Sequence, residues 1–221
     1  MWSAFVFTSL AAFSAPPSRV AKGVARDVSP MAMKKGDPLR GRELIDSERC
    51  MECHGVDGQG AGHPNGPEGK FAKLAGQHPD YLLKQIRDFR SGARKHDQMA
   101  IMARSISDED VIDIAAHFAL QPVMKGEPGP INELGQRLYE QGDAARGVPA
   151  CVACHGPNGK GVPGLTLMPL VGGQEWRYLD KQLRDWRSGE RRNGADAGMN
   201  LAARNLSDAD IEALASHLAA Q

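Results

Sequence analysis

The chain has 221 residues, which is enough for two small domains or one large one. Lysine plus arginine and aspartate plus glutamate each total 27, so no overall field favours a nucleic-acid partner. Aromatic residues make up only 5% of a chain that is 41% hydrophobic, which leaves room for a large apolar cofactor in its core.

The N-terminal segment differs from the rest of the chain. Residues 1–35 hold five basic residues and one acidic residue. Residues 2–13 form an apolar run that is too short to span a bilayer but resembles the core of a secretory signal, with Ala12-Phe13-Ser14 as a cleavage pattern. No lysine or arginine precedes this run, so a frayed tail is the alternative. We expect residues 1–35 to comprise a signal peptide and a tail, the protein to be periplasmic, and no later segment to be an integral membrane helix.

The rest of the chain is an internal repeat. Five blocks recur in the same order: residues 41–45 with 135–139, 50–55 with 151–156, 76–85 with 173–182, 87–92 with 184–189, and 107–117 with 207–217. Each copy spans fewer than about 100 residues, which predicts a duplicated small domain and not a solenoid. We place the first domain at residues 36–120 and the second at 131–221. Residues 121–130 hold three prolines and two glycines, cannot continue a helix, and form the linker.

Both copies are predicted to be all-α. Each begins with a short helix before its cysteine motif. Apolar residues at the helical period predict a second helix at residues 79–89 and its counterpart at 176–186. Ser107 and Ser207 are predicted N-caps of the last helix, because acidic residues follow each of them. The stretch between each cysteine motif and the second helix is rich in glycine, proline and asparagine, so we expect a long ordered loop there.

The motif C-x-x-C-H occurs at residues 50–54 and again at 151–155, and it uses all four cysteines. Two thiols at this spacing can each add to a vinyl group on one edge of a porphyrin, and the adjacent histidine can reach the iron. A thioredoxin-like pair would follow a strand, a zinc site needs four ligands, and disulfides would leave both histidines unexplained. The motif therefore predicts two covalently bound haem c groups, attached through Cys50, Cys53, Cys151 and Cys154.

Each iron needs two axial ligands from the chain. We predict that His54 and His155 each provide one, and that Met99 and Met199 provide the other. Both methionines lie at the same distance before the capping serine of the last helix, in an otherwise diverged loop. A methionine kept in both copies favours ligation over gap filling, and methionine with histidine is a known haem ligand set.

Other polar residues allow more than one interpretation. His117 and His217 match each other and are rival ligands, but they lie on the last helix, where we expect packing. His63, His78 and His96 have no counterpart in the second copy and are expected at the surface. A basic group flanks the methionine-bearing segments. It forms a solvated face, docks acidic partners or pairs with haem propionates, and its members are Arg90, Arg94, Lys95, Arg187, Arg191 and Arg192.

With the twinned cysteine motif, the paired methionines and the segment Leu74-Ala-Gly-Gln77, the chain resembles the two-domain dihaem class I cytochromes of the cytochrome c4 family over residues 36–221. The resemblance implies two tandem class I cytochrome c domains with a haem in each and pseudo-twofold packing. In that family a proline carbonyl holds the axial histidine. Pro169 fits this role in the second copy, but Ala72 occupies the position in the first.

The resemblance, together with two six-coordinate irons, implies a one-electron carrier and not an enzyme. We expect a periplasmic respiratory chain that passes electrons towards a membrane-bound terminal oxidase, with an upstream electron donor as the second partner. A two-haem peroxidase needs an open iron, and a thiosulfate-oxidising site with a cysteine ligand has no spare cysteine. The alternative that stays open is the haem-bearing electron-acceptor subunit of a dehydrogenase, such as a flavocytochrome sulfide dehydrogenase.

Overall fold

The computed structural model describes residues 1, 35–60, 71–127 and 129–221. Regular secondary structure in these residues is helical, apart from an isolated bridge between Asp143 and Val148. The predicted all-α class is confirmed. The predicted signal sequence, nearly all of the tail, and His63 lie outside the described residues.

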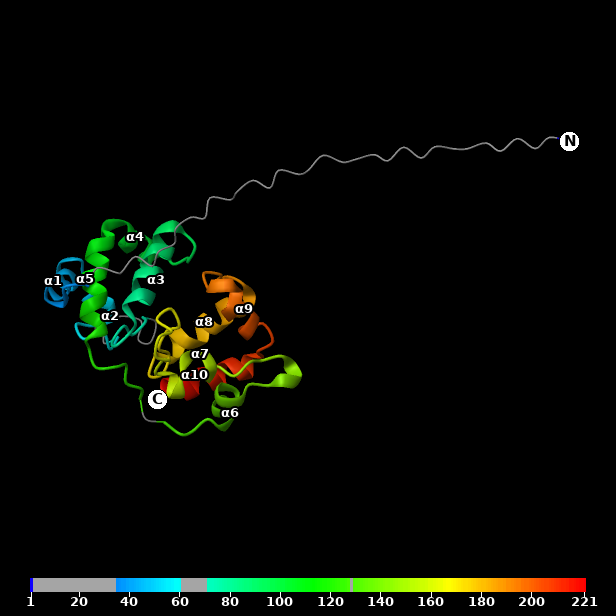
Figure 1. Cartoon of the computed structure of the whole chain (residues 1–221). Coiled ribbons are helices and arrows are strands. Elements are labelled where there is room, and N and C mark those ends of the chain that lie inside the picture. The colour runs from blue at the N-terminus through cyan, green and yellow to red at the C-terminus, as the bar shows by residue number, and fades with distance from the viewer. Residues whose placement is uncertain (2–34, 61–70, 128) are drawn as a thin grey trace. The chain divides into compact units, whose positions relative to one another are not determined.

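The helices repeat in the same order in both copies of the domain, which we call the first and second halves (Figure 1). The first half contains α1 (Pro38–Ser47), α2 (Met51–His54), α3 (Pro79–Ser91), α4 (Asp97–Ser105) and α5 (Asp108–Ala119). The second half contains α6 (Glu133–Gln141), α7 (Val152–His155), α8 (Trp176–Ser188), α9 (Gly198–Ala203) and α10 (Asp208–Ala219). It also has three short 3-10 helices: η1 (Ala144–Arg146), η2 (Pro157–Gly159) and η3 (Ala195–Ala197).

Local residues fix where these helices begin and end. Helices α3 and α8 each continue two residues past the predicted end, because the glycine that adopts the left-handed conformation follows there: Gly92 with φ 81° and Gly189 with φ 76°. Ser107 and Ser207 cap α5 and α10 as predicted, and each hydroxyl accepts a hydrogen bond from the N–H three residues on.

The segments that carry the paired methionines are helical, which corrects the expectation of loops. Met99 lies in the first turn of α4, and Met199 is the second residue of α9. The cap of α4 is His96, whose Nδ1 accepts a hydrogen bond from the Met99 N–H at 3.3 Å. Both helices are short, and histidine and alanine are not usual capping residues, so the sequence carries no helix-start signal that the residue types alone would reveal.

The first helix of each half crosses the last helix at a glycine. A Cβ atom added to Gly41 would lie 2.0 Å from the carbonyl oxygen of Asp113, and one added to Gly135 would lie 2.1 Å from that of Ala213. Real Cβ atoms essentially never approach another atom closer than 3.0 Å. The backbones of α1 and α5, and of α6 and α10, therefore pass closer than any side chain permits, which explains why both copies keep a glycine here.

Each half buries its own apolar core. The core of the second half is one large cluster that includes Leu138, Tyr139, Val148, Leu179, Trp186, Leu206, Ile211 and Leu214. The first half distributes its buried residues over two smaller clusters, one around Ile45, Leu82 and Phe118 and one around Leu83, Ile106 and Val111. The predicted apolar faces of α3 and α8 supply residues to these cores, as the helical period requires.

The described residues of the linker form no helix between α5 and α6, as its prolines and glycines predict, and hydrogen bonds attach the linker to both halves. Met124 is only 1% exposed, and its N–H donates to the carbonyl of Ala75 in the first half at 3.2 Å. The Gly126 N–H donates to the carbonyl of Gln221 at the end of the second half at 3.0 Å. These contacts lie within one compact unit, residues 34–221.

Two matching glutamines join the halves reciprocally. Gln77 accepts a hydrogen bond from the Leu170 N–H at 3.0 Å and donates to the Leu170 carbonyl at 2.9 Å. Gln174 accepts from the Lys73 N–H at 2.7 Å and donates to the Lys73 carbonyl at 3.0 Å. Lys73 and Leu170 occupy matching positions of the repeat, so this exchange is the pattern that a pseudo-twofold axis produces.

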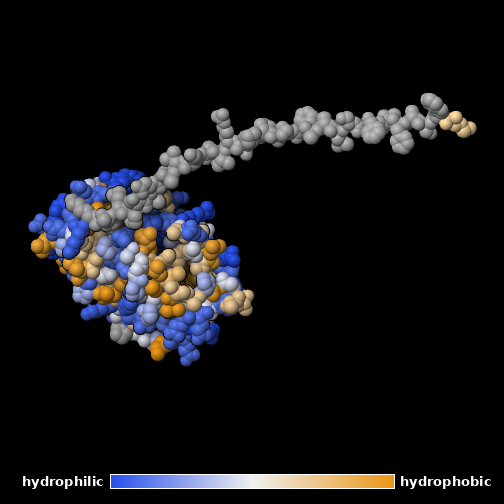
Figure 2. Space-filling view, viewed as in Figure 1, coloured by the Kyte–Doolittle hydropathy of each residue, from blue (hydrophilic) through white to orange (hydrophobic). Residues whose placement is uncertain are grey.

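The surface shown in Figure 2 is largely hydrophilic, with hydrophobic residues in patches. Among the exposed apolar side chains are Ile101 and Leu201, which are 62% and 53% exposed and lie two residues after Met99 and Met199. Each methionine-bearing helix thus presents an apolar side chain to solvent at a matching position. No helix of the described residues is both long enough and apolar enough to cross a membrane.

Candidate functional site

Each C-x-x-C-H motif forms one short helical turn, α2 or α7, that ends at its histidine. Residues three apart are neighbours on the surface of such a turn, so the two cysteines of a motif lie close together. The four cysteines form no disulfide in the structure. In the part of the chain that the structure describes, no group of three or more His, Cys, Asp or Glu residues could hold a metal ion, so a zinc site has no support there.

The first thiol of each motif faces the core. Cys50 packs against the first-half cluster around Ile45, and Cys151 packs against the second-half cluster. Burial raises the pKa of both thiols to about 11. Cys154, in contrast, is exposed. The motif therefore spans the boundary between core and solvent, which suits a flat apolar group that is buried except along one edge.

The two histidines of the motifs are held in the same way. His54 Nδ1 lies 2.7 Å from the carbonyl oxygen of Ala72, and His155 Nδ1 lies 2.8 Å from that of Pro169. A carbonyl only accepts, so Nδ1 carries the proton and Nε2 keeps its lone pair. Burial lowers the pKa of both rings, which favours the neutral form that binds a metal.

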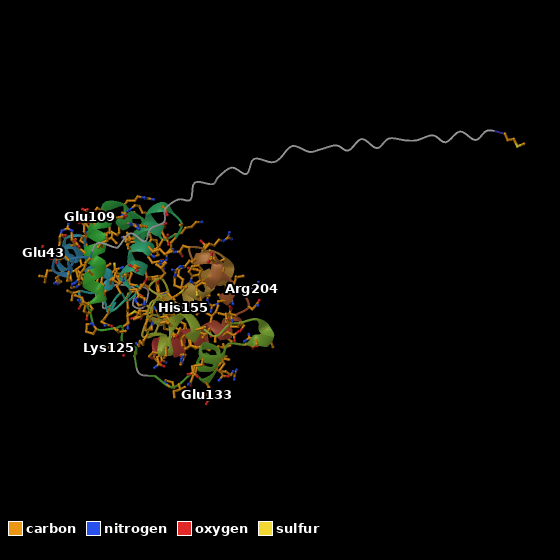
Figure 3. The ribbon with its side chains drawn as sticks, viewed as in Figure 1. Glu43, Glu109, Lys125, Glu133, His155 and Arg204 are labelled. Carbon is orange, nitrogen blue, oxygen red and sulfur yellow. The ribbon has the colours of Figure 1, made fainter. Side chains whose placement is uncertain are left out.

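The free nitrogen of each ring is available for an iron. Among the described residues no hydrogen bond reaches Nε2 of His54 or His155. Figure 3 shows His155 among the side chains of the second half, whereas Glu133 and Arg204 lie at its margin. Ala72 supplies the same carbonyl contact as Pro169, so the departure from the family pattern leaves the orientation of the histidine intact.

The predicted methionine ligands are half-buried. Met199 packs against the second-half core, as Cys151 does. Met99 is the third residue of α4, a helix of nine residues that leads to the capped start of α5. Their ligation of iron, like that of the two histidines, stays a prediction.

His117 and His217 take part in packing, as expected. Each is 8% exposed, and their Cβ atoms lie against the glycines of the two helix crossings. The His117 ring meets Phe118 edge to face with centroids 5.5 Å apart, and the His217 ring lies 5.7 Å from Tyr139.

Of the unmatched histidines, His96 is exposed, as expected, although its ring caps α4. The expectation of a surface position holds only in part for His78, which is half-buried. Its Nε2 atom is buried without a partner, because the second half covers it near Gly161.

The six basic residues that flank the methionine-bearing segments divide into three pairs. Arg90 and Arg187 join α3 to α5 and α8 to α10: Arg90 binds Asp108 at 2.6 Å, and Arg187 binds Asp208 at 2.6 Å. The neighbours Lys95 and Arg192 are exposed. Arg94 and Arg191 are only 8% and 7% exposed, so they are not a solvated face.

Arg94 is shared between the halves. It donates to Gln85 of its own half at 2.8 Å and to Tyr178 and Gln182 of the second half, both at 2.9 Å. Its guanidinium lies 4.6 Å from the centre of the Phe89 ring, a stacked cation–π arrangement.

Arg191 repeats this arrangement from the other half. It donates to Gln182 at 2.6 Å, and to Tyr81 and Gln85 of the first half at 3.2 and 3.0 Å. It stacks over Trp186 at 4.4 Å. The signal that could have revealed this pair is the repeated Ser-Gly-x-Arg, at residues 91–94 and 188–191.

The two buried guanidinium groups have no carboxylate within ion-pair distance among the described residues. Their partners are neutral amide and phenol oxygens. Burial raises the pKa of Tyr178, but the charges of Arg94 and Arg191 outweigh it and hold that pKa below its ordinary value. Buried charges are ordinarily paired. The chain therefore fits a group that carries carboxylates, has an apolar body, adds to two thiols and binds an imidazole nitrogen, and haem c has all four properties.

Comparison with known proteins agrees with this chemistry. The family model described as Cytochrome c matches residues 39–119 and 133–221. The chain is 41% identical over 190 residues to a cytochrome c4 of Pseudomonas aeruginosa, which covers 85% of this chain and 90% of that protein. It is 38% identical over 174 residues to a thiosulfate dehydrogenase electron acceptor of Stutzerimonas stutzeri, which covers 77% of each. The crystal structure of reduced recombinant cytochrome c4 from Pseudomonas stutzeri matches with a TM-score of 0.74 at 40% identity, over 83% of this chain and 97% of that one.

Proposed function

We propose, from the premise that this chain belongs to the cytochrome c family, that it carries electrons in a periplasmic respiratory chain towards a membrane-bound terminal oxidase. Two tandem cytochrome c domains and similarity to cytochromes c4 make it an electron-transfer protein with two covalently bound haem c groups. The periplasmic location, the electron donor and the terminal oxidase are proposed here.

When bound, each haem supplies an iron that changes its oxidation state by one electron. The residues of this chain supply the rest. Cys50 and Cys53 would hold the porphyrin covalently, and Nε2 of His54 and the sulfur of Met99 would bind its iron. Cys151, Cys154, His155 and Met199 would act in the same way in the second half. A methionine on each iron leaves no position for a substrate, which favours a carrier over an enzyme.

The observation that carries this proposal is the repeated orientation of the two histidines. In both halves a main-chain carbonyl fixes the proton on Nδ1, at 2.7 Å in the first half and 2.8 Å in the second. This fixes the tautomer and the ring orientation before any iron binds. The site can then change charge with little rearrangement, which a fast carrier requires.

Arg94 and Arg191 would hold carboxylates of the bound haems. Removal of a buried guanidinium would leave a carboxylate uncompensated and favour the oxidised iron. We expect Arg94→Gln and Arg191→Gln each to lower a reduction potential by roughly 60 mV, a tenfold change in the one-electron equilibrium. Lys95→Gln and Arg192→Gln remove exposed charges next to them and should change little, because solvent screens those charges. Redox titration followed by visible absorbance measures both pairs.

Substitution of the methionines tests directly whether they bind the two irons. Met99→Ala and Met199→Ala should each remove about half of the far-red methionine-to-iron charge-transfer band and open one iron to carbon monoxide or cyanide. Met102→Ala, a methionine without a counterpart in the second half, is the control. A full band in Met199→Ala, or its loss in His217→Ala, would show that another residue binds the iron.

A second candidate function follows from one relative. The thiosulfate dehydrogenase electron acceptor that this chain resembles favours a role as the electron-accepting partner of a dehydrogenase. A flavocytochrome-type subunit role belongs to the same class. Size-exclusion chromatography of native material at its natural concentration separates the cases: a stable complex with a dehydrogenase supports the subunit, and a free protein that cross-links to both a donor and an oxidase supports the shuttle.

Export to the periplasm has its own test. Mass spectrometry of native protein should show a chain that starts after residue 12, because residues 2–13 resemble a signal core. An intact Met1 terminus in a cytoplasmic fraction would contradict the periplasmic assignment.

A further inference from the structure

The two predicted methionine ligands are held in different ways. Met99 sits in a nine-residue helix whose cap, His96, accepts a hydrogen bond from the Met99 N–H. Met199 sits in a helix of only six residues, α9, whose capping residue Ala197 makes no side-chain hydrogen bond. Local structure therefore supports Met99, and it gives Met199 little support.

The backbone that enters α9 is strained. Asp196 and Ala197 both adopt the left-handed conformation, with φ 49° and 54°. This conformation is unfavourable for residues with a Cβ, and here two such residues adopt it in succession. A segment of this kind relaxes unless contacts elsewhere hold it.

One side chain supplies those contacts. The Asn200 amide donates both of its hydrogens to main-chain carbonyls, to Trp186 in α8 at 2.7 Å and to Arg191 just beyond α8 at 2.9 Å. Asn200 follows Met199 directly, so the two bonds fix the position of α9 against α8 at the residue next to the ligand. The matching residue in the first half is Ala100, which has no side-chain donor.

We propose that Asn200 is a positioning residue for Met199, and that its two hydrogen bonds hold the strained entrance of α9 so that the methionine stays on the second iron. This proposal rests on the proposed role of Met199 as the axial ligand. It predicts an asymmetry: the first iron stays closed through local helix structure, whereas the second stays closed through one amide.

The test uses the full haem-loaded protein with Asn200→Ala and the matched control Asn205→Ala. Asn205 also donates its amide to a main-chain carbonyl, that of Arg146 at 2.7 Å, but it lies beyond α9. Cyanide added to the oxidised protein is the probe, with the far-red band as a second readout. We expect Asn200→Ala to reduce that band by up to half and to bind cyanide at one iron at least about fivefold more tightly, as the loss of two hydrogen bonds implies. The control should keep the parental band and affinity.

A further variant tests the strain. Ala197→Gly removes the Cβ cost of the left-handed conformation, so the double variant Asn200→Ala/Ala197→Gly should recover part of the band. Equal behaviour of Asn200→Ala and Asn205→Ala would overturn the positioning role, and no recovery in the double variant would overturn the contribution of strain. Met199→Ala distinguishes a failure of the proposed ligand from a failure of the positioning role. If it keeps the full band, the proposed ligand fails; if it loses half while Asn200→Ala loses nothing, only the positioning role fails.

Discussion

The two halves share their cysteine motif and last helix but differ in the segment that joins the first helix to that motif. In the first half, α1 leads almost directly into α2. In the second half the connection between α6 and α7 contains η1 and the bridge between Asp143 and Val148. Val148 is 3% exposed and belongs to the second core, so the longer connection is part of the packed structure.

Two matching carboxylates form ion pairs with arginines from different segments of the two halves. Asp110 and Asp210 occupy matching positions in the first turn of α5 and α10. Asp110 binds Arg40 from the start of α1, whereas Asp210 binds Arg146 from the longer connection. Both halves thus pair the carboxylate three residues after the capping serine with a guanidinium, but different segments supply that guanidinium.

The largest expected effect comes from breaking the second of these pairs. Arg146 and the hydrogen bonds from Ser207 lower the pKa of Asp210 to about 2, although burial opposes this. The carboxylate is 5% exposed, but Arg146 is 40% exposed, so solvent weakens the pair. Arg146→Ala should therefore lower the free energy of unfolding at neutral pH, measured by thermal or urea unfolding followed by circular dichroism.

The pH dependence has a definite sign. Because folding depresses the pKa of Asp210, its contribution is complete above the unfolded value near 3.8 and is lost as the pH falls towards 2. The parent protein should lose this stability over that window, and Arg146→Ala should lose less of it. Arg137→Ala, at an exposed site in α6, is the control. An equal loss in both variants would show that the pair contributes nothing specific.

The fold could be predicted from the sequence where one short stretch carries the information. The repeat, the motif at residues 50–54 and the capping serines Ser107 and Ser207 depend on local spacing, and the structure contains the corresponding elements. The methionine-bearing helices could not be predicted, because α9 is held by contacts with α8 and not by its own cap.

Contacts between the halves were also beyond the sequence. Arg94 and Arg191 resemble the exposed basic residues beside them, but the structure buries both, and each donates to Gln85 and to Gln182. The burial of His78 Nε2 could not be predicted for the same reason, because it lies near Gly161 of the second half. The ligands themselves could be proposed from the repeat, since a haem ligand must recur in each copy.

A smaller effect is expected where the two cores differ at one matching position. Tyr139 is 1% exposed and donates its hydroxyl to the carbonyl of Gly156 at 2.6 Å, whereas its counterpart Ile45 is fully buried and makes no polar contact. Tyr139→Phe leaves that carbonyl without its partner and should cost about 1 kcal/mol of unfolding free energy. Ile45→Val is the matched change in the first half and should cost a similar amount through lost packing. Chemical denaturation measures both, and an unchanged Tyr139→Phe would mean that water replaces the hydroxyl.

The smallest expected effect concerns the carbonyl that orients each histidine. Ala72 and Pro169 hold His54 and His155 at nearly equal distances, so the proline is not needed for the contact. Proline should contribute to stability through the unfolded chain, because its fixed φ leaves fewer backbone conformations to lose on folding. Among the described residues, no hydrogen bond from the Ala72 N–H is seen.

Ala72→Pro should therefore raise the free energy of unfolding by about 0.4–1 kcal/mol and leave the far-red band unchanged, while Pro169→Ala should lower it by a similar amount. Thermal unfolding of the haem-loaded protein measures the stability, and the visible spectrum reports the orientation of the histidine. If Ala72→Pro destabilised the protein or altered the spectrum of one haem, the backbone at this position would differ between the halves. The near-equal contacts of the two histidines would then arise from different local conformations, and the two sites would be less alike than their distances indicate.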